Sequence, residues 1–208
     1  MQWVLSSFAE FDKNVLGVAA GVFSFIGYVP YFHGILKGRV RPHIFSWVIW
    51  TLLAGIVFFA QVAKGAGPGA WATGLSGILC AIIVVMSFWY GDKRATWSDW
   101  FFFLVGLTAI PVWQLTRDPQ WAVILVAFVN SAAYYPTFRK SYAKPREEAL
   151  SMYFVSSLKN VLSVMAIESY SLTTVLYPVV ATVLSVLFIG MSLQRRRALE
   201  DAKIPSPV

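Results

Sequence analysis

The stretch GYVPYFHGILKGRVRPHIFSW, residues 27–47, recurs downstream as AYYPTFRKSYAKPREEALSM, residues 133–152. Pro30 aligns with Pro136 at an offset of 106, which falls to 105 after a one-residue gap in the loop. Each copy ends one apolar segment, passes through a basic loop and begins another apolar segment. The recurrence predicts that the fold is built from two copies of one helical unit.

The offset of 105 continues into a third apolar segment in each copy. Cys80 then aligns with Ser185, and Ser87 aligns with Ser192. Each repeat is therefore expected to contain three helices. Two consecutive three-helix units would point in opposite directions because three is odd, and one further helix between them makes them parallel.

The chain has the composition of a protein surrounded by lipid. Of its 208 residues 58% are hydrophobic and 13% are charged, with a mean hydropathy of +0.64. A water-soluble domain of this size is far less apolar. A helix needs about 20 apolar residues to cross about 30 Å of hydrocarbon. Seven segments come close to that length, at residues 15–36, 43–63, 71–90, 100–115, 121–138, 150–167 and 172–193.

We therefore predict an all-α integral membrane protein with seven transmembrane helices in a single membrane domain, residues 1–208. Residues 15–90 and 121–193 are expected to form two parallel three-helix bundles, joined by a linker helix at residues 100–115. Residues 194–208 are expected to form a cytoplasmic tail. Parallel repeats of this kind are one of the patterns of secondary transporters.

Basic residues decide the predicted orientation of a chain whose net charge is +7. With the N-terminus outside, the inside segments hold 13 Lys and Arg residues and the outside segments hold 3. The positive-inside rule then makes the C-terminus cytoplasmic, and it assigns the basic charge to loops rather than to a nucleic-acid-binding surface. The first residues lack the pattern of a signal peptide. Together with the compact loops, this favours a bacterial inner membrane.

Polar residues gather on one face of several predicted helices. Ser24 and Tyr28 share a face of the first helix, and the repeat places Asn130 and Tyr134 at the equivalent positions of the fifth. Such a stripe lines a solute site or only joins helices. Trp50 adds an aromatic side chain suited to ring-shaped solutes. The predicted substrate-binding residues are Ser24, Tyr28, Trp50, Asn130, Tyr134, Lys159, Asn160 and Ser185.

Lys159 lies near the middle of the predicted sixth helix, beside Asn160. A lysine at that depth is costly, and none of the seven apolar segments contains Asp or Glu. Three interpretations stay open. The lysine contacts an anionic or highly hydroxylated substrate, it loses its proton and takes part in coupling, or it extends toward the interface and bonds carbonyl groups.

Pro30 and Pro136 are the predicted hinges. Each removes one helical hydrogen bond and can bend its helix near the inner end. Paired hinges suit alternating access. Static kinks are the alternative, because membrane helices tolerate proline.

Repeat two carries PTF at residues 136–138, a basic loop with Lys144, and then Glu148 and Ser151. This run resembles the junction of helices 5 and 6 in the SWEET sugar facilitators. Pro30 with its basic loop is similar to the PQ-loop motif of the same superfamily. The resemblance implies a 3+1+3 helix plan and a sugar or sugar-like solute, moved without ATP by alternating access.

The WVIW stretch at residues 47–50 looks like the WxxW stretch of nicotinamide riboside transporters, which share this helix plan. Vitamin or nucleoside uptake is therefore the alternative within transport. A receptor or scaffold of the same fold is the alternative outside it. In that case the basic face of Arg39, Arg41, Lys144 and Arg146 would bind a partner or anionic lipids.

Enzymatic function is not expected. The sequence contains no P-loop, GxGxxG, HExxH or CxxC motif, so we expect no cofactor and no metal site. The expected partners are a small solute and the lipid bilayer, with self-association left open.

Overall fold

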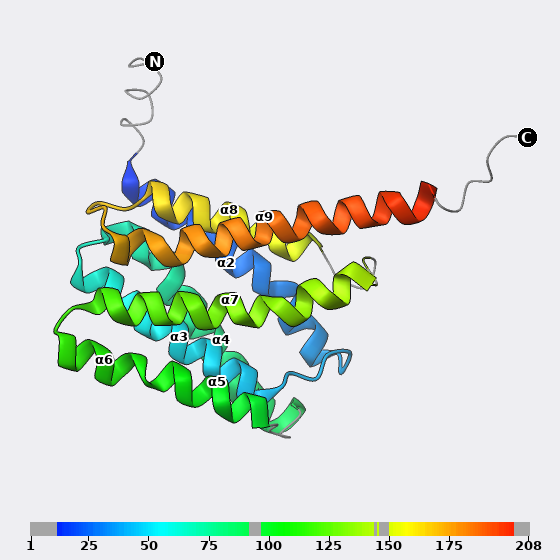
Figure 1. Ribbon diagram of the computed structural model, residues 1–208, viewed down its shortest axis with the longest axis horizontal. Coiled ribbons are helices and arrows are strands. Elements are labelled where there is room, and N and C mark those ends of the chain that lie inside the picture. The colour runs from blue at the N-terminus through cyan, green and yellow to red at the C-terminus, as the bar shows by residue number, and fades with distance from the viewer. Residues whose placement is uncertain (1–11, 92–96, 144, 146–149, 202–208) are drawn as a thin grey trace, which may run out of the picture.

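The computed structural model of the chain describes residues 12–91, 97–143, 145 and 150–201, which form helices and turns without a β-strand. Figure 1 shows the helices with their long axes roughly aligned. Their bounds are α2 Lys13–Leu36, α3 Ile44–Ala63, η1 Gly67–Ala70, α4 Trp71–Tyr90, α5 Trp97–Leu107, α6 Ala109–Thr116, α7 Pro119–Ala143, α8 Leu150–Met165 and α9 Leu172–Asp201.

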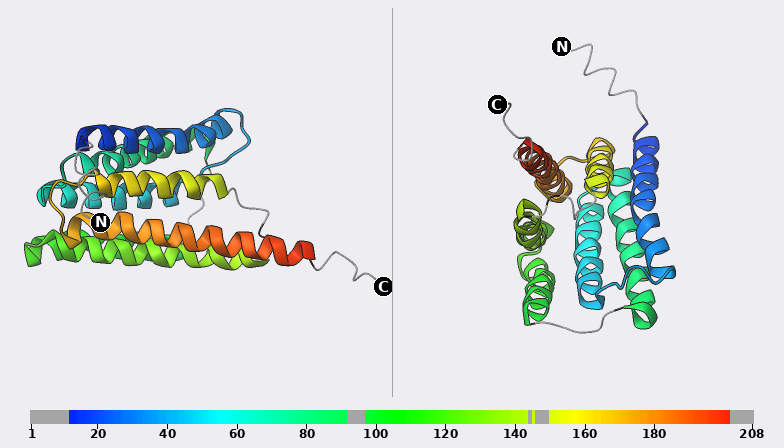
Figure 2. Two further views of the ribbon diagram at one scale, coloured as in Figure 1. Left: turned by 90° about the horizontal axis from the view of Figure 1, so that it is seen from above. Right: turned by 90° about the vertical axis from the view of Figure 1, so that its right-hand side faces the viewer.

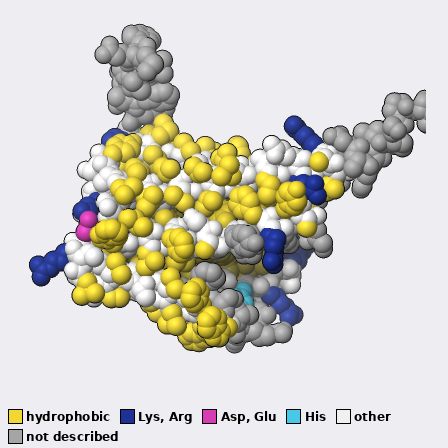
Figure 3. All heavy atoms as spheres, in the orientation of Figure 1, with side chains coloured by type: hydrophobic (Ala, Val, Ile, Leu, Met, Phe, Trp, Pro, Cys, Tyr) yellow, Lys and Arg dark blue, Asp and Glu magenta, His cyan; other side chains and the backbone are white. Residues whose placement is uncertain are grey.

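Four stretches of the described helices are long and apolar enough to cross a membrane: Lys13–Leu36, Ile44–Ala63, Gly67–Tyr90 and Leu172–Glu200. Phe103–Thr116 and Pro119–Ala132 are shorter apolar stretches. Large apolar side chains also face outward along the helices, and Figure 3 shows them across much of the visible surface. Such a surface suits contact with lipid.

Local sequence explains where the first helices begin and end. The Asp12 side chain accepts a hydrogen bond from the backbone N–H of Asn14 at 2.9 Å and caps the start of α2. Gly38 and Gly65 follow the ends of α2 and α3 with φ of 67° and 71°. Glycine adopts this left-handed conformation at little cost, so the chain turns back at both points.

Six helices form a closed ring. Neighbours pack against each other in the order α2, α4, α3, α7, α9, α8 and back to α2. In α2–α4 the third helix lies between the first two, and α9 likewise lies between α7 and α8. We call α2–α4 the first unit and α7–α9 the second unit. The left view of Figure 2 shows the helices side by side.

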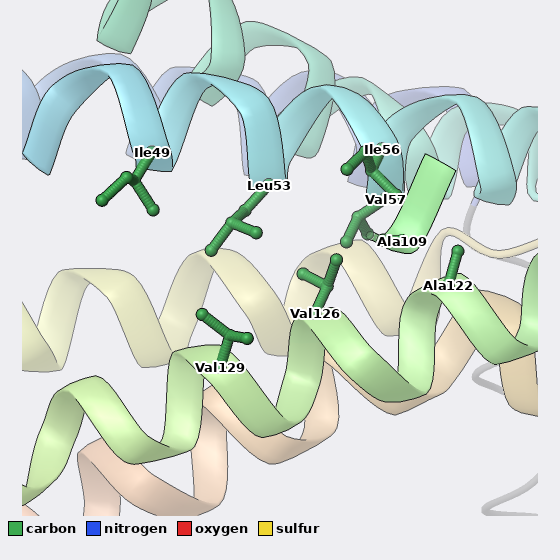
Figure 4. Close-up of a cluster of buried hydrophobic side chains, with 8 residues drawn as sticks. All are labelled: Ile49, Leu53, Ile56, Val57, Ala109, Ala122, Val126 and Val129. Atoms are coloured by element: carbon green, nitrogen blue, oxygen red, sulfur yellow. The ribbon is translucent and has the colours of Figure 1, made fainter. Parts of the chain in front are cut away.

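Helices α5 and α6 lie outside this ring, where α5 packs against α3 and α6 against α7. Ala109 of α6 joins a buried apolar cluster between the two units, in which Leu53 of α3 faces Val126 and Val129 of α7 (Figure 4). In lipid such a contact stabilises through van der Waals packing rather than through the hydrophobic effect. The cluster therefore joins α3, α6 and α7.

The expected helix at residues 100–115 is wrong in one respect, because the chain forms two helices that meet at Thr108. Pro111 explains the break. Proline has no N–H to bond the carbonyl four residues earlier, and its ring crowds that carbonyl, which belongs to Leu107, the last residue of α5. The hydroxyl of Thr108 turns back to the carbonyl of Val105 at 2.6 Å.

Other bounds also differ from those expected. Helix α7 continues to Ala143, five residues beyond the expected end at 138, and α5 begins at Trp97 rather than at residue 100. Helix α8 ends at Met165 rather than at Ile167. Helix α9 continues through Arg195 to Asp201, eight residues beyond the expected end at 193. Hydropathy predicts the part of a helix that lies in lipid, whereas a polar stretch with good helix formers extends the same helix into water. Residues 202–208 of the predicted tail lie outside the described residues.

Candidate functional site

A cavity of about 310 Å³ lies inside the ring and is lined by side chains from all six helices. Its volume falls at the lower end of the range of ligand pockets, which is about 300–1,000 Å³. Seven of the eight predicted site residues line it, namely Ser24, Tyr28, Trp50, Asn130, Tyr134, Lys159 and Asn160. Ser185 does not line the cavity, although it lies next to Tyr134, which does. Their role in binding a substrate stays a prediction.

The two tyrosines make equivalent contacts in the two units. The Tyr28 hydroxyl lies 3.2 Å from the Cys80 sulfur, and the Tyr134 hydroxyl lies 3.0 Å from the Ser185 hydroxyl. These are the residue pairs that the internal repeat aligns. In each unit the contact joins the first helix to the third helix, so the cavity has related walls on its two sides.

Ser76 links the two units. Its hydroxyl donates to the Ala72 carbonyl at 2.8 Å and lies 2.8 Å from the Ser24 hydroxyl. A hydroxyl has a single proton, so Ser24 is the donor in that second pair. The Lys159 ammonium donates to the same Ser76 oxygen at 3.3 Å. Ser76 thereby uses its proton and both lone pairs, and it joins α2, α4 and α8.

Lys159 is the single charged residue among those described around the cavity. In the described part of the chain its ammonium has one hydrogen-bond partner, the Ser76 hydroxyl. An ammonium carries three N–H donors, so two donors are left for the cavity.

Five other side chains with a hydroxyl or amide group line the cavity with no hydrogen bond to any described residue: Thr73, Asn130, Ser156, Asn160 and Tyr177. Asn160 is only 4% exposed. Buried polar groups are almost always paired with protein, water or a ligand. This set of donors and acceptors therefore fits a cavity that holds water or a polar solute.

Two indoles form an aromatic wall on the side of α3. The rings of Trp47 and Trp50 meet edge to face with centroids 4.8 Å apart. The Trp47 Nε1–H donates to the Tyr31 hydroxyl at 3.1 Å. The Trp47 side chain is 4% exposed and packs inside the protein. The reason is its polar partner, because Tyr31 satisfies the indole N–H away from water.

Hydrogen bonds join the two units at the end where α3 and α8 finish, which we call the closed end. The loop after α3 bonds there to the loop after α8: Ser169 N–H donates to the Gly65 carbonyl at 3.1 Å, and Glu168 N–H donates to the Ala66 carbonyl at 3.1 Å. The Ser163 hydroxyl also donates to the Gly69 carbonyl. All three bonds join the first unit to the second.

Two longer side chains add to these contacts. The Lys13 ammonium donates to the Ile167 carbonyl at 2.7 Å, and Gln61 Nε2 donates to the Thr174 carbonyl at 3.0 Å. Both bonds again cross between the units. The closed end is therefore held by backbone and side-chain hydrogen bonds together.

The opposite end is the basic end, where α2 and α9 finish. Arg39 and Arg41 are exposed there, while Lys144 and Arg146 of the predicted partner surface lie outside the described residues. Lining residues from the first turns of α3 and α8, Trp47 and Met152, extend the cavity toward this end.

The predicted hinge Pro30 is not among the described residues that line the cavity. Pro30 lies inside a continuous α2 with its side chain exposed. The backbone of Pro136 lies inside α7, and its side chain is outside the described residues. A hinge role for either proline stays a prediction.

Sequence reasoning missed Ser76 and Thr73. Ser76 lies one helical turn before Cys80, so a search for polar residues on the Cys80 face would have found it. Among the described residues no group of three or more His, Cys, Asp or Glu could hold a metal ion.

Comparison with protein-family models, with curated proteins and with solved structures finds no match for this chain. The resemblance to SWEET and PQ-loop proteins therefore stays a prediction.

Proposed function

We propose that this protein is an ATP-independent membrane transporter that moves a small polar solute by alternating access. The observation that carries the proposal is the cavity, which lies at the centre of two related three-helix units. It is lined by polar side chains that have no partner in the described chain, and hydrogen bonds join the two units at one end. A solute site between two repeats is the arrangement that such transport requires.

The proposal includes seven membrane spans, with α5 and α6 together forming one broken span. Support for parallel repeats comes from the contacts. The Ser169 N–H donates to the Gly65 carbonyl and the Glu168 N–H to the Ala66 carbonyl, so α3 and α8, the second helices of the two units, finish at the same end. Within the first unit Ser24 pairs with Ser76 and Tyr28 with Cys80, both at a separation of 52 residues, so α2 and α4 run in the same direction. Tyr134 and Ser185 pair at a separation of 51 in the second unit.

The basic end is proposed to face the cytoplasm of a bacterial cell, in line with the positive-inside rule. In that orientation the closed end faces the outside. A sugar or sugar-like molecule is the first candidate solute, because hydroxyls and amides surround an aromatic wall. A nucleoside-like vitamin is the second candidate, since Trp47 and Trp50 lie together at the cavity.

The single cysteine of the chain offers a direct test, because Cys80 lines the cavity. Purified protein in oriented proteoliposomes is treated with a membrane-impermeant thiol reagent on one side at a time. We expect the reagent to modify Cys80 from the basic side. Modification of Cys80 from the other side is expected to increase when a transported solute is present. A Ser156→Cys reporter in a Cys80→Ser background provides a less enclosed thiol in the same cavity.

Uptake of sugars, nucleosides, nicotinamide riboside and small organic acids is measured in the same vesicles. Asn130→Ala is expected to reduce uptake without loss of folded protein. Reporters unreactive from both sides, together with no uptake of any solute, would refute transport and favour a receptor or scaffold.

A further inference from the structure

We infer that the transported solute is a small organic monoanion, a hydroxylated ring acid of the uronate class, whose carboxylate binds Lys159. The inference rests on the proposed transport function and specifies the chemistry of its solute. It has three grounds: the charge of the cavity, the donors that are left over inside it, and the difference between its two sides.

The charge of the residues that line the cavity favours a solute with one negative charge. Its described lining contains Lys159 and no Asp, Glu, Arg or His. A buried charge without a counter-ion is expensive, and a lysine at membrane depth normally faces an opposite charge or a water-filled cavity. A carboxylate on the solute supplies that partner, whereas a neutral sugar leaves the ammonium without one.

The hydrogen-bond geometry leaves the ammonium ready for a ligand. Ser76 already accepts two hydrogen bonds and donates one, so it has no capacity for a solute. It holds one Lys159 N–H and leaves the other two to bind carboxylate oxygens. Charge-assisted hydrogen bonds of this kind are stronger than neutral ones.

The other polar groups fit hydroxyls. Asn130 and Asn160 each offer an amide donor and acceptor, and Ser156 and Thr73 offer hydroxyl groups. On the α3 side Trp50 offers an apolar ring face, which suits the C–H face of a sugar ring. A hydroxylated ring therefore fits the cavity better than a simple aliphatic acid.

The difference between the two sides limits the solute to one carboxylate. At the offset of 105, the first-unit position equivalent to Lys159 is Ala54, which also lines the cavity. The second unit therefore provides a cation, and the first unit provides a methyl group at the related position. A dicarboxylate would leave its second charge without a partner.

The test compares D-glucuronate with D-glucose, which differ by a carboxylate in place of a hydroxymethyl group. Uptake into proteoliposomes is measured for both, together with protection of Cys80 from an impermeant alkylating reagent applied on the basic side. We expect glucuronate to protect at a concentration at least about tenfold lower than glucose, since a hydrogen bond to a charged group is worth a factor of about ten or more. The protection assay uses the unaltered chain, so it does not depend on a variant folding.

Variants then assign the effect to the ammonium. Lys159→Met is expected to remove the preference for glucuronate, and Lys159→Arg, which keeps the charge, is expected to keep part of it. Lys37→Met changes an exposed lysine in the same way and should leave the preference intact.

Each contrary result has a distinct meaning. Glucose handled as well as glucuronate, or a preference that survives in Lys159→Met, overturns the anion assignment and leaves transport standing. Uptake of another organic monoanion but of neither glucuronate nor glucose overturns the uronate class alone, and uptake of a neutral solute only overturns the anion assignment. An unreactive cavity with no uptake of any solute overturns both proposals.

Discussion

Among the described residues, the hydrogen bonds at the two ends of the molecule join different parts of it. At the closed end, hydrogen bonds cross between the units, as from Ser169 to Gly65 and from Gln61 to Thr174. At the basic end, Arg195 Nε donates to the carbonyl of Tyr142 at 3.1 Å, and Arg196 Nε donates to that of Pro145 at 2.8 Å, all within the second unit. The difference teaches that opening the cavity at the closed end must break contacts between the units.

The largest expected effect comes from Gly69→Ala. A Cβ at this position would lie 2.9 Å from the Ile167 Cα and 2.9 Å from the Ser163 carbonyl oxygen. Backbone atoms cannot move aside easily, so we expect a loss of about 1–3 kcal/mol in stability, typical of overpacking. Thermal unfolding in detergent measures the loss, and Cys80 modification from the outer side should accelerate.

Gly190→Ala is the matched control, because no atom lies within 4 Å of the Cβ that it adds. Equal unfolding temperatures for the two variants would show that the closed end is not tightly packed.

The next effect is expected for Ser163→Ala. This change removes the hydrogen bond to the Gly69 carbonyl and leaves a buried acceptor without its partner, at a cost of about 1–3 kcal/mol. Ser157→Ala is the control, since among the described residues the Ser157 hydroxyl bonds within its own helix, to the Tyr153 carbonyl. If both variants unfold and react with the thiol reagent alike, the Ser163 bond does not hold the units together.

A smaller effect is expected for Gln61→Met. Gln61 is fully buried, and it donates to the Thr174 carbonyl while its Oε1 has no partner among the described residues. Methionine loses one hydrogen bond between the units but also removes an unsatisfied oxygen. We therefore expect a net loss of at most about 1 kcal/mol, measured by thermal unfolding, and a loss above that of Ser163→Ala would contradict this reasoning.

The smallest effect is expected at the rim of the closed end. Asp118 accepts a hydrogen bond from the backbone N–H of Gln120 and pairs with Lys64 at 3.2 Å. The hydrogen bond from the Gln120 N–H lowers the pKa of the Asp118 carboxyl most, and Lys64 lowers it further. A lowered pKa adds stability above the unfolded value of about 3.9, and this stability disappears as the pH falls through the folded value.

Asp118→Asn should therefore be slightly less stable than the unaltered chain at pH 7 and equal to it in strong acid. A difference that stays constant over this pH range would rule out the carboxylate as its source.

Sequence patterns predict the helix ends of the first unit closely because glycine and proline residues mark the turns between its helices. The expected ends of α4 at residues 71 and 90 agree with the structure, as do the ends of α2 and α3 within two residues. The break at Thr108 was not predicted, because hydropathy is averaged over a whole segment. Such an average does not show that Pro111 displaces the carbonyl of a single residue.

The candidate site was also predicted only in part. Lys159 stands out in the sequence because a charge at membrane depth is costly, and the repeat leads from Tyr28 to Tyr134. The partner of Lys159 could not be predicted, because Ser76 lies on another helix of the other unit. Only packing decides which face of α4 meets α2, and the sequence of one helix does not encode that choice alone.

The lone ammonium at the cavity has an electrical consequence. With Lys159 protonated, the empty carrier moves one positive charge across the membrane field, and the carrier loaded with a monoanion moves none. A potential of 100 mV changes the energy of one transferred charge by up to about 2.3 kcal/mol. An inside-negative potential therefore slows the outward return of the empty carrier. One-for-one exchange of anions should run faster than net uptake, and collapsing the potential should remove the difference.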